Sequence, residues 1–244
     1  MQVGPLTGYG RALRDYHAGA VDASLIVHSD LGEHDELPLS IFFRTPDEFF
    51  PFERDTLDLC RGTVLDLGAG TGVHSLAVQE RGFSVRAVEI VPAALEIMQA
   101  RGVRDVVRGD GFACDGEPAD TLLMMMNGIG PTGTLDGLDD FLGRAGSLVK
   151  PSGQILMDSA KVQRREEAPG APDVSWPPRT GDYIGEAWVR LEYRGELGPP
   201  FRELYLDFGT LADHAVRANW KSEVVSGEAD GAYVARLTLA TPGA

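Results

Sequence analysis

The chain has 244 residues, 43% of them hydrophobic, and a formal net charge of −15 at pH 7. This length suits one large α/β domain with a small cap, and the hydrophobic fraction supports a sizeable core. The negative charge repels nucleic acid and anionic membranes, so neither is an expected partner.

The first residues of the chain give mixed signals. Residues 9–16 have a helical pattern, three prolines then interrupt a segment rich in phenylalanine, and residues 53–60 predict a helix that leads into the first strand. We therefore predict an N-terminal cap of helix and loops over residues 1–60.

From residue 63 onward, short apolar strands alternate with helices. Strands are predicted at residues 63–67, 84–89, 104–108, 120–126 and 153–158, and helices at residues 73–81, 92–101 and 134–148. This alternation is typical of a parallel sheet with helices on both faces. Because right-handed crossovers bring the carboxyl ends of such strands to one edge, we expect the ligand there.

The alternation ends near residue 160. Residues 161–185 are rich in proline and poor in apolar side chains, which predicts a loop or insertion. Residues 188–194 alternate apolar and polar side chains, as a half-exposed strand does, and residues 204–207 can pair with them as a hairpin. A helix and two strands are predicted to follow, at residues 210–219, 220–225 and 232–240. With a hairpin turn at Asp230-Gly231, the chain is expected to end in antiparallel strands.

Compartment and metal content are also constrained. The two cysteines, Cys60 and Cys114, could form one bridge, but nothing indicates a disulfide framework, and no cluster of Cys and His has the spacing of a zinc site. The first residues lack the basic and apolar segments of a signal peptide, and the longest apolar run, Leu122 to Met126, is far shorter than a membrane span. We expect a cytoplasmic protein without a bound metal.

The most informative stretch runs from Asp66 to Gly72, where three glycines at alternate positions lie between a strand and a helix. Glycine tolerates positive φ and lets a ligand lie against the backbone, and the helix N-terminus favours a carboxylate or phosphate. The dinucleotide fingerprint would have glycine where Val73 stands. Because an acid before the first glycine suits an amine better than a pyrophosphate, the pattern favours a ligand with a cationic amine.

Polar side chains follow the next three predicted strands. Glu89 can accept hydrogen bonds from both hydroxyls of a ribose, and the alternative is a solvated loop acid. Asp110 can accept from an adenine amino group while the following backbone N–H donates to the ring, and the alternative is a turn aspartate before glycine. Asn127 either holds a reacting group or caps the loop.

With these residues identified, residues 63 to about 159 resemble the core of class I S-adenosylmethionine-dependent methyltransferases. Asp66 to Gly72 match the first motif of that family, Glu89 the acid of its second, and Asp110 the acid after its third strand. Asn127 matches the position that borders the transferred methyl. The resemblance implies an α/β fold with a Rossmann-like, doubly wound, seven-stranded, mostly parallel sheet whose last strand is antiparallel.

The resemblance also implies S-adenosyl-L-methionine as cofactor and S-adenosyl-L-homocysteine as product. It places the methionine part on the glycine turn, the ribose on Glu89 and the adenine on residues 110–112. The predicted cofactor-binding residues are Asp66, Gly68, Ala69, Gly70, Gly72, Glu89, Ile90, Asp110, Gly111, Phe112 and Asn127. The methyltransferase core would span residues 61–244, with an insertion carrying a small β-hairpin at about 160–207.

The methyl acceptor is predicted to be a small molecule bound by residues 1–50 and by the insertion. Asn127 is not followed by two prolines and an aromatic residue, as in methyltransferases that act on nucleic-acid bases, so base methylation is not expected. Aromatic residues in these two segments suit a partly apolar acceptor, although packing is the alternative role for each. They are Tyr9, Tyr16, Phe42, Phe43, Trp176, Tyr183 and Trp188.

No catalytic residue is assigned from the sequence. A general base is needed only if the acceptor loses a proton early, and the candidates are His74, His28 and Asp158. Arg44 is predicted to pair with a carboxylate of the acceptor or with a surface acid. The alternative functions are a nicotinamide-dependent oxidoreductase on the same type of sheet, and a non-catalytic S-adenosylmethionine-binding or interaction protein.

Overall fold

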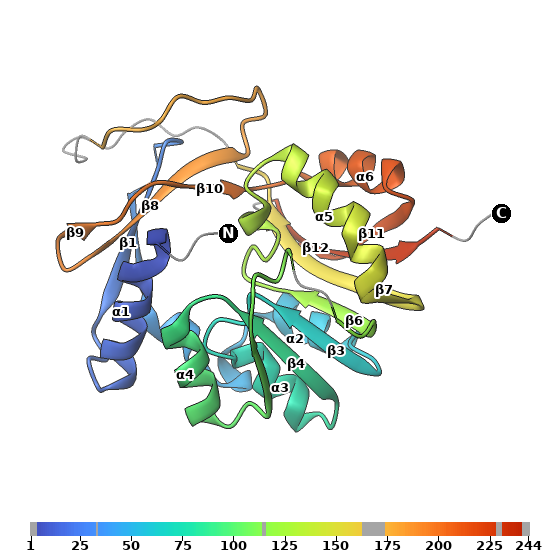
Figure 1. Ribbon diagram of the computed structural model, residues 1–244, viewed down its shortest axis with the longest axis horizontal. Coiled ribbons are helices and arrows are strands. Elements are labelled where there is room, and N and C mark those ends of the chain that lie inside the picture. Colours follow the sequence, from blue (N-terminus) through green and yellow to red (C-terminus); the bar gives the residue numbers. More distant parts are fainter. Residues whose placement is uncertain (1–3, 33, 114–115, 163–173, 228–230, 241–244) are drawn as a thin grey trace.

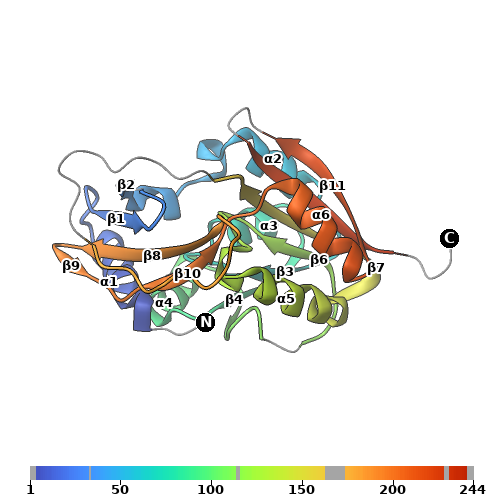
Figure 2. The ribbon, with the colours of Figure 1, turned by 90° about the horizontal axis from the view of Figure 1, so that it is seen from above.

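The computed structural model describes residues 4–32, 34–113, 116–162, 174–227 and 231–240. These residues form two sheets, a seven-stranded core sheet and a smaller five-stranded sheet. Figure 1 shows the smaller sheet on the left and the core sheet on the right, and Figure 2 shows the same separation from above.

The core sheet has the strand order β11-β12-β7-β6-β3-β4-β5. Its strands are β3 (Thr63–Leu67), β4 (Ser84–Glu89), β5 (Asp105–Arg108), β6 (Ala119–Met124), β7 (Val149–Ala160), β11 (Trp220–Gly227) and β12 (Ala232–Leu239). Strands β3 to β7 are parallel, and β12 runs antiparallel to both of its neighbours. The predicted Rossmann-like fold with an antiparallel last strand is confirmed. The strand order reverses between β3 and β6, which is where ligands bind in such sheets.

Helices cover both faces of the core sheet. The face of α2, α3 and α4 includes Val64 and Ala87, and the face of α5 and α6 includes Leu65 and Leu67. Successive side chains of a strand point to opposite faces, so β3 contributes to both layers. The helices are α2 (Pro51–Asp58), α3 (Val73–Glu80), α4 (Pro92–Arg101), α5 (Leu135–Leu148) and α6 (Phe208–Arg217).

Most predicted core elements are present with small shifts at their ends. The exception is β7, which begins at Val149 instead of residue 153 because Val149 pairs with Ala119 before a register irregularity. Asp230 of the predicted turn at Asp230-Gly231 lies outside the described residues, and so does Cys114. Cys60 is buried and has a free thiol. None of the helices in the described ranges is both long and apolar enough to span a membrane.

The smaller sheet joins two segments that are distant in sequence. Its strands are β1 (Ser24–Ser29), β2 (His34–Pro38), β8 (Glu186–Tyr193), β9 (Glu196–Leu197) and β10 (Phe201–Leu204). Their order is β10-β8-β1-β2, with β9 paired to β8. Helix α1 (Thr7–His17) packs against α4, β8 and β1, and so connects the two sheets. Short 3-10 helices lie at Gly4–Leu6, Leu39–Phe42, Pro46–Glu48 and Gly130–Thr132.

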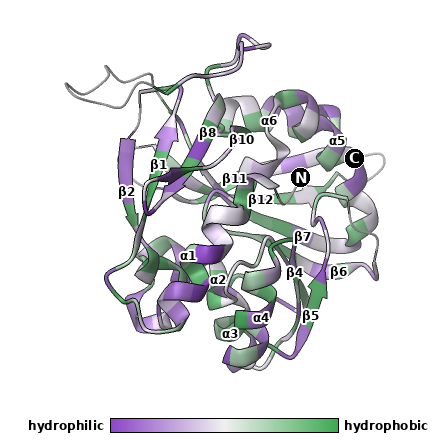
Figure 3. Ribbon diagram, turned by 60° about the vertical axis from the view of Figure 1, so that its left-hand side comes forward, coloured by the Kyte–Doolittle hydropathy of each residue, from purple (hydrophilic) through white to green (hydrophobic). Residues whose placement is uncertain are grey.

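Strands β1 and β2 lie where the sequence analysis predicted only helix and loops. Strand β2 has a polar sequence and is mostly exposed, and it is largely hydrophilic in Figure 3. Its conformation depends on pairing with β1, which no local pattern reveals. The predicted hairpin exists, but its partner strand is β10 instead of residues 204–207. The boundary between a cap of residues 1–60 and a core of residues 61–244 stays a prediction.

Candidate active site

A cavity of about 380 Å³ opens at the carboxyl edge of the core sheet. The loops after β3, β4, β5 and β6 form one side of it, and α1, β1, β8 and β10 contribute to the other. All the predicted cofactor-binding residues except Gly72 line this cavity. The volume is in the range of small-molecule sites.

The glycine turn after β3 forms one wall of the cavity. Gly68 and Gly70 have φ values of +71° and +56°, which favour glycine. Gly72 has a φ of +82°, and a Cβ there would lie 2.8 Å from Val103 Cγ2 and 2.9 Å from Met98 Cγ. The absence of a side chain at Gly72 thus allows the end of α4 to pack against the turn. Gly72 faces this helix, which is why it does not line the cavity.

Two buried acids flank the glycine turn. Glu89 accepts hydrogen bonds from the backbone N–H groups of Gly70 (2.8 Å), Ile90 (2.7 Å) and Val91 (2.8 Å). Burial raises the pKa of Glu89, and these three bonds oppose that shift. A carboxylate has about four acceptor positions, so this one keeps capacity for a ligand hydroxyl.

Asp66 holds the turn from the other side. Its Oδ2 accepts a hydrogen bond of 2.6 Å from Ser75 Oγ in the first turn of α3. Burial raises the pKa of Asp66, and the bond from Ser75 opposes the shift. The acid that begins the motif therefore connects β3 to α3 while also facing the cavity.

The N-terminal cap is fixed onto the glycine turn. The hydroxyl of Thr71 donates to the carbonyl of Phe42, and Arg101 donates to the carbonyl (2.9 Å) and hydroxyl (2.8 Å) of Thr71. A Cβ at Gly70 would lie 3.7 Å from the hydroxyl of Tyr9. Burial raises the pKa of Tyr9, so this hydroxyl stays protonated beside the turn.

Asp110 also lines the cavity, at the exit of β5. Its Oδ1 accepts a hydrogen bond of 3.0 Å from the backbone N–H of Phe112, and the Phe112 ring packs 5.2 Å from that of Phe141. Asp110 therefore shapes a turn, as in one sequence-based alternative, and it also lines the cavity, whereas its predicted contact with an adenine amino group stays a prediction.

Asn127 lines the cavity and also anchors the loop after β6. Its φ is +55° and that of Met126 is +64°, which are uncommon for residues other than glycine and accumulate at functional sites. Its Nδ2 donates to Glu203 Oε1 (3.1 Å) and to the carbonyl of Leu204 (3.2 Å), and its Oδ1 accepts from Ser159 Oγ (3.0 Å). Asn127 lines the cavity and joins the exit of β6 to β7 and β10.

His28 is not placed to act on a ligand in the cavity. Leu25 and Val27 line the cavity, and His28 is absent from its wall because successive side chains of β1 point to opposite faces. Its Nε2 lies 2.9 Å from Glu192 Oε2, and its Nδ1 lies 3.1 Å from His34 Nδ1.

His74 lines the cavity and belongs to a buried charge network. Its Nε2 lies 2.8 Å from Glu53 Oε1, and Arg44 donates two bonds of 2.7 and 2.8 Å to the same carboxylate. Burial raises the pKa of Glu53, but the bonds from His74 and Arg44 outweigh it and lower the pKa to about 2. Arg44 therefore pairs with a buried acid, which neither sequence-based alternative included.

Asp158, the third base candidate, supports the loop after β6. The backbone N–H of Gly128 lies 3.4 Å from its Oδ1, and the residue is not part of the cavity wall. Burial raises the pKa of Asp158 to about 6.

The two segments predicted to bind the acceptor both line the cavity, but mostly through other side chains. Tyr9 and Phe42 line it. Tyr16 instead stacks on Phe43 with ring centroids 4.5 Å apart, and Tyr183 donates to Asp207. Residues that the sequence analysis did not single out complete this wall, namely Leu6, Leu25, Val27, Leu37, Leu191, Phe201, Arg202, Glu203 and Tyr205. The pairing of β1, β2, β8 and β10 in the smaller sheet brings most of them together, so no local signal marks them.

The order of the core strands and the ligand cavity at the glycine turn define a Rossmann-like enzyme fold. A solved structure with this architecture is a SAM-dependent methyltransferase from Bacteroides fragilis in complex with S-adenosyl-L-homocysteine. It is 35% identical in sequence, with a TM-score of 0.84, and the match covers 98% of this chain and 97% of that one. The chain belongs to the class I S-adenosylmethionine-dependent methyltransferases, and S-adenosyl-L-methionine is its cofactor.

More distant structures share the fold. The CcbJ methyltransferase from Streptomyces caelestis is 16% identical with a TM-score of 0.60, over 80% of this chain and 94% of that one. The sugar N-methyltransferase KedS8 from Streptoalloteichus sp ATCC 53650 is 16% identical with a TM-score of 0.54, over 83% and 92%. Neither the family models nor the curated proteins that were compared match this sequence.

Proposed function

We propose that this methyltransferase acts on a small molecule that binds in the acceptor end of the cavity. We define the acceptor end as the part lined by the N-terminal cap and the smaller sheet. The observation that carries the proposal is that one continuous cavity contains both the cofactor motifs and this second wall. The second wall is mainly apolar and comes from two distant chain segments, which suits a small acceptor better than a macromolecule.

The cofactor contacts inferred from the sequence are part of this proposal. Glu89 would bind the ribose, the glycine turn the methionine part, and residues 110–112 the adenine. The geometry supports this assignment, because the Glu89 carboxylate and the turn face the same cavity. Gly68 and Gly70 line the wall and, as glycines, present backbone with no side chain to it.

S-adenosylmethionine supplies an electrophilic methyl group on a sulfonium. The work of the protein is then to align the acceptor with that methyl and to exclude water. Asn127 is fixed at the exit of β6 between the two ends of the cavity and is suited to position the acceptor. If a base is needed, His74 is the one of the three candidates that lines the cavity, and Glu53 holds its Nε2.

The sugar N-methyltransferase named above supports a small acceptor for this fold. The test is to incubate the protein with S-adenosylmethionine carrying a deuterated methyl group and a cell extract split into small-molecule, protein and nucleic-acid fractions. Mass spectrometry is expected to find the label in small molecules, and a reaction without the protein is the control. Label found solely in protein or nucleic acid would refute the proposal.

A further inference from the structure

The backbone of the glycine turn is largely bonded within the protein. Four of its N–H groups donate to protein acceptors, those of Gly68, Ala69, Gly70 and Gly72. Two of these bonds go to the carbonyl of Val88, and one goes to the carboxylate of Glu89. The methionine part of S-adenosyl-L-methionine carries a carboxylate and an ammonium group. If that part lies on the turn, its carboxylate needs a donor from elsewhere in the cavity.

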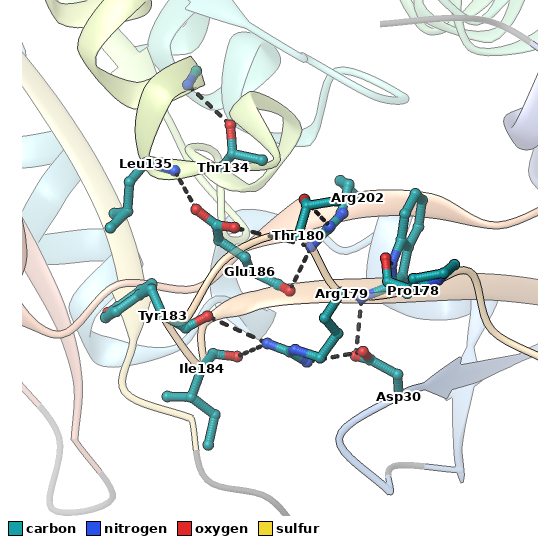
Figure 4. A network of polar contacts seen from close by, with 12 residues as sticks. Asp30, Thr134, Leu135, Pro178, Arg179, Thr180, Tyr183, Ile184, Glu186 and Arg202 are labelled. Carbon is teal, nitrogen blue, oxygen red and sulfur yellow. Dashed lines mark hydrogen bonds and ion pairs between the residues drawn. The ribbon is translucent and has the colours of Figure 1, made fainter.

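The described wall of the cavity contains two basic side chains, His74 and Arg202. Arg202 comes from β10 at the acceptor end. It donates to the carbonyl of Glu186 (3.0 Å) and to the hydroxyl of Thr180 (2.8 Å), as Figure 4 shows. His74 lies in the first turn of α3, directly after the glycine turn. His74 is therefore the basic side chain of the cofactor end.

Two arginines lie close to His74 or to the glycine turn, but neither is part of the cavity wall. Arg44 donates both of its terminal nitrogens to Glu53, at 2.7 and 2.8 Å. Arg101 donates to the carbonyl (2.9 Å) and hydroxyl (2.8 Å) of Thr71, and its guanidinium lies 5.4 Å from the centroid of the Phe43 ring. Both guanidinium groups are thus bound by the protein.

One nitrogen of the His74 ring is also bound by the protein. Its Nε2 lies 2.8 Å from Glu53 Oε1, and Glu53 is not part of the cavity wall. Because Glu53 is ionised at neutral pH, it accepts the hydrogen of Nε2. Within the part of the chain that the structure describes, no group is hydrogen-bonded to Nδ1. Nδ1 is therefore the ring nitrogen left for a ligand.

The surroundings of His74 match both charges of an amino acid. Asp66 lines the cavity as well, and burial raises its pKa while the charge of His74 opposes the shift, so the two side chains are close. An ammonium group gains from Asp66, and a carboxylate gains from an N–H of the His74 ring. The first N–H groups of α3 lack helical partners, and Gly72 at the N-cap has no side chain to bind them. They add to the attraction for a carboxylate at this place.

The hydroxyl of Tyr9 is another donor beside the turn. A Cβ at Gly70 would lie 3.7 Å from it. Burial and the charge of Glu89 both raise the pKa of Tyr9, so its hydroxyl is close to that carboxylate. Because Glu89 would repel a second carboxylate there, Tyr9 is the less favourable of the two donors.

We propose that His74 binds the carboxylate of the methionine part of S-adenosyl-L-methionine through Nδ1–H, while Nε2–H stays on Glu53. The inference rests on the cofactor contacts of the proposed function and specifies one of them. The ring binds as an imidazolium between two carboxylates, one of the protein and one of the cofactor. A ring that donates from both nitrogens has no lone pair for a proton of the acceptor. His74 is then a cofactor-binding residue and not a general base.

The test compares S-adenosyl-L-homocysteine with its carboxamide, in which an uncharged amide replaces the carboxylate. Calorimetry measures both affinities, and the carboxamide is titrated in competition with S-adenosyl-L-homocysteine if it binds weakly. The wild type is expected to bind the carboxylate at least about tenfold more tightly than the amide, as one charge-assisted hydrogen bond allows. His74→Gln is expected to lose most of this preference, mainly by weaker binding of the carboxylate.

Two substitutions separate the two nitrogens of the ring. The amide nitrogen of glutamine takes the place of Nε2, and that of asparagine takes the place of Nδ1. His74→Gln keeps a donor to Glu53 and loses the donor to the cavity, and His74→Asn does the reverse. The affinity for S-adenosyl-L-homocysteine is expected to fall more in His74→Gln. The free energy of unfolding in urea is expected to fall more in His74→Asn, whereas a merely structural histidine would show no such separation.

Two further variants are controls. His214→Gln changes a buried histidine whose Nδ1 lies 2.6 Å from Asp139 Oδ1 and which is not part of the cavity wall. Tyr9→Phe removes the other donor beside the turn. Both variants are expected to keep the preference for the carboxylate.

Equal affinities of the wild type for the two compounds, or an unchanged preference in His74→Gln, would overturn the inference. So would a loss of the preference in Tyr9→Phe, since Tyr9 would then be the donor. A His74→Gln variant with unchanged affinities but slower methyl transfer would also overturn it, since His74 would then act on the acceptor.

Failure of the proposed function has different signs. Label transferred solely to macromolecules would refute the small acceptor and leave the binding results for His74 intact. An unchanged affinity for S-adenosyl-L-homocysteine in Glu89→Ala would refute the proposed cofactor contacts, whatever His74→Gln does.

Discussion

The buried carboxylate of Glu53 links the N-terminal cap to the core and is expected to contribute strongly to the free energy of unfolding. It accepts two bonds from Arg44, one from His74 and one from the backbone N–H of Phe50, and it is 1% exposed. In Glu53→Gln, the amide NH₂ would face one of these donors, and the buried Arg44 would lose its counter-charge.

Two estimates of the stability lost in Glu53→Gln agree. The pKa of Glu53 falls from 4.5 to about 2, and at 1.36 kcal/mol per unit this corresponds to about 3 kcal/mol of stability. Removing one partner of a buried ion pair typically costs about 3–5 kcal/mol. We therefore expect Glu53→Gln to lower the free energy of unfolding by about 3 kcal/mol at pH 7.

The pH dependence gives a sharper test. Because the folded pKa of Glu53 is depressed, its contribution is fully present above pH 4.5 and is lost as the pH falls toward 2. Urea unfolding of both proteins between pH 7 and pH 2.5 should show a difference that is largest at pH 7 and shrinks on acidification. Glu196→Gln, which removes an exposed ion pair with Arg11, is the control and should unfold nearly as the wild type does. A cost below about 1 kcal/mol at pH 7, or a difference that does not change with pH, would refute the reasoning.

Three further predictions concern the glycine turn and its surroundings. Glu89→Ala should weaken binding of S-adenosylhomocysteine by at least about tenfold in calorimetry. Glu80 is exposed, and its replacement by alanine should leave the affinity unchanged. An unchanged affinity in Glu89→Ala would remove Glu89 from the ribose role. Gly72→Ala should lower the free energy of unfolding, measured in urea, more than Gly82→Ala does. Both positions have positive φ, but of these two only a Cβ at position 72 meets Val103 and Met98. Equal losses of stability in the two variants would mean that this packing is unimportant. Asp158→Asn should become more stable relative to the wild type as the pH rises from 4 to 7. The folded pKa of Asp158 is raised to about 6, so ionisation of this carboxyl lowers the stability of the wild type over that range. A difference in melting temperature that stays constant with pH would contradict the assignment.

The core fold and the cofactor class could be predicted from the amino-acid sequence. The signals were local: apolar strands of about five residues, glycines at alternate positions after Asp66, and polar residues at strand ends such as Glu89. Parallel strands with right-handed crossovers have few possible arrangements, so these local signals were enough to place the strand ends at one edge.

The acceptor end of the cavity, in contrast, could not be predicted and became apparent in the folded chain. The alternating pattern of β8 predicts that strand, but β2 is polar and β1 finds its partner β8 far along the chain, so no periodic pattern predicts how the smaller sheet is assembled. The pairs of Arg44 with Glu53 and of Asn127 with Glu203 likewise join residues from different elements. Such contacts depend on how the elements pack, because a charged or amide side chain has no preferred partner until folding brings one within hydrogen-bond distance.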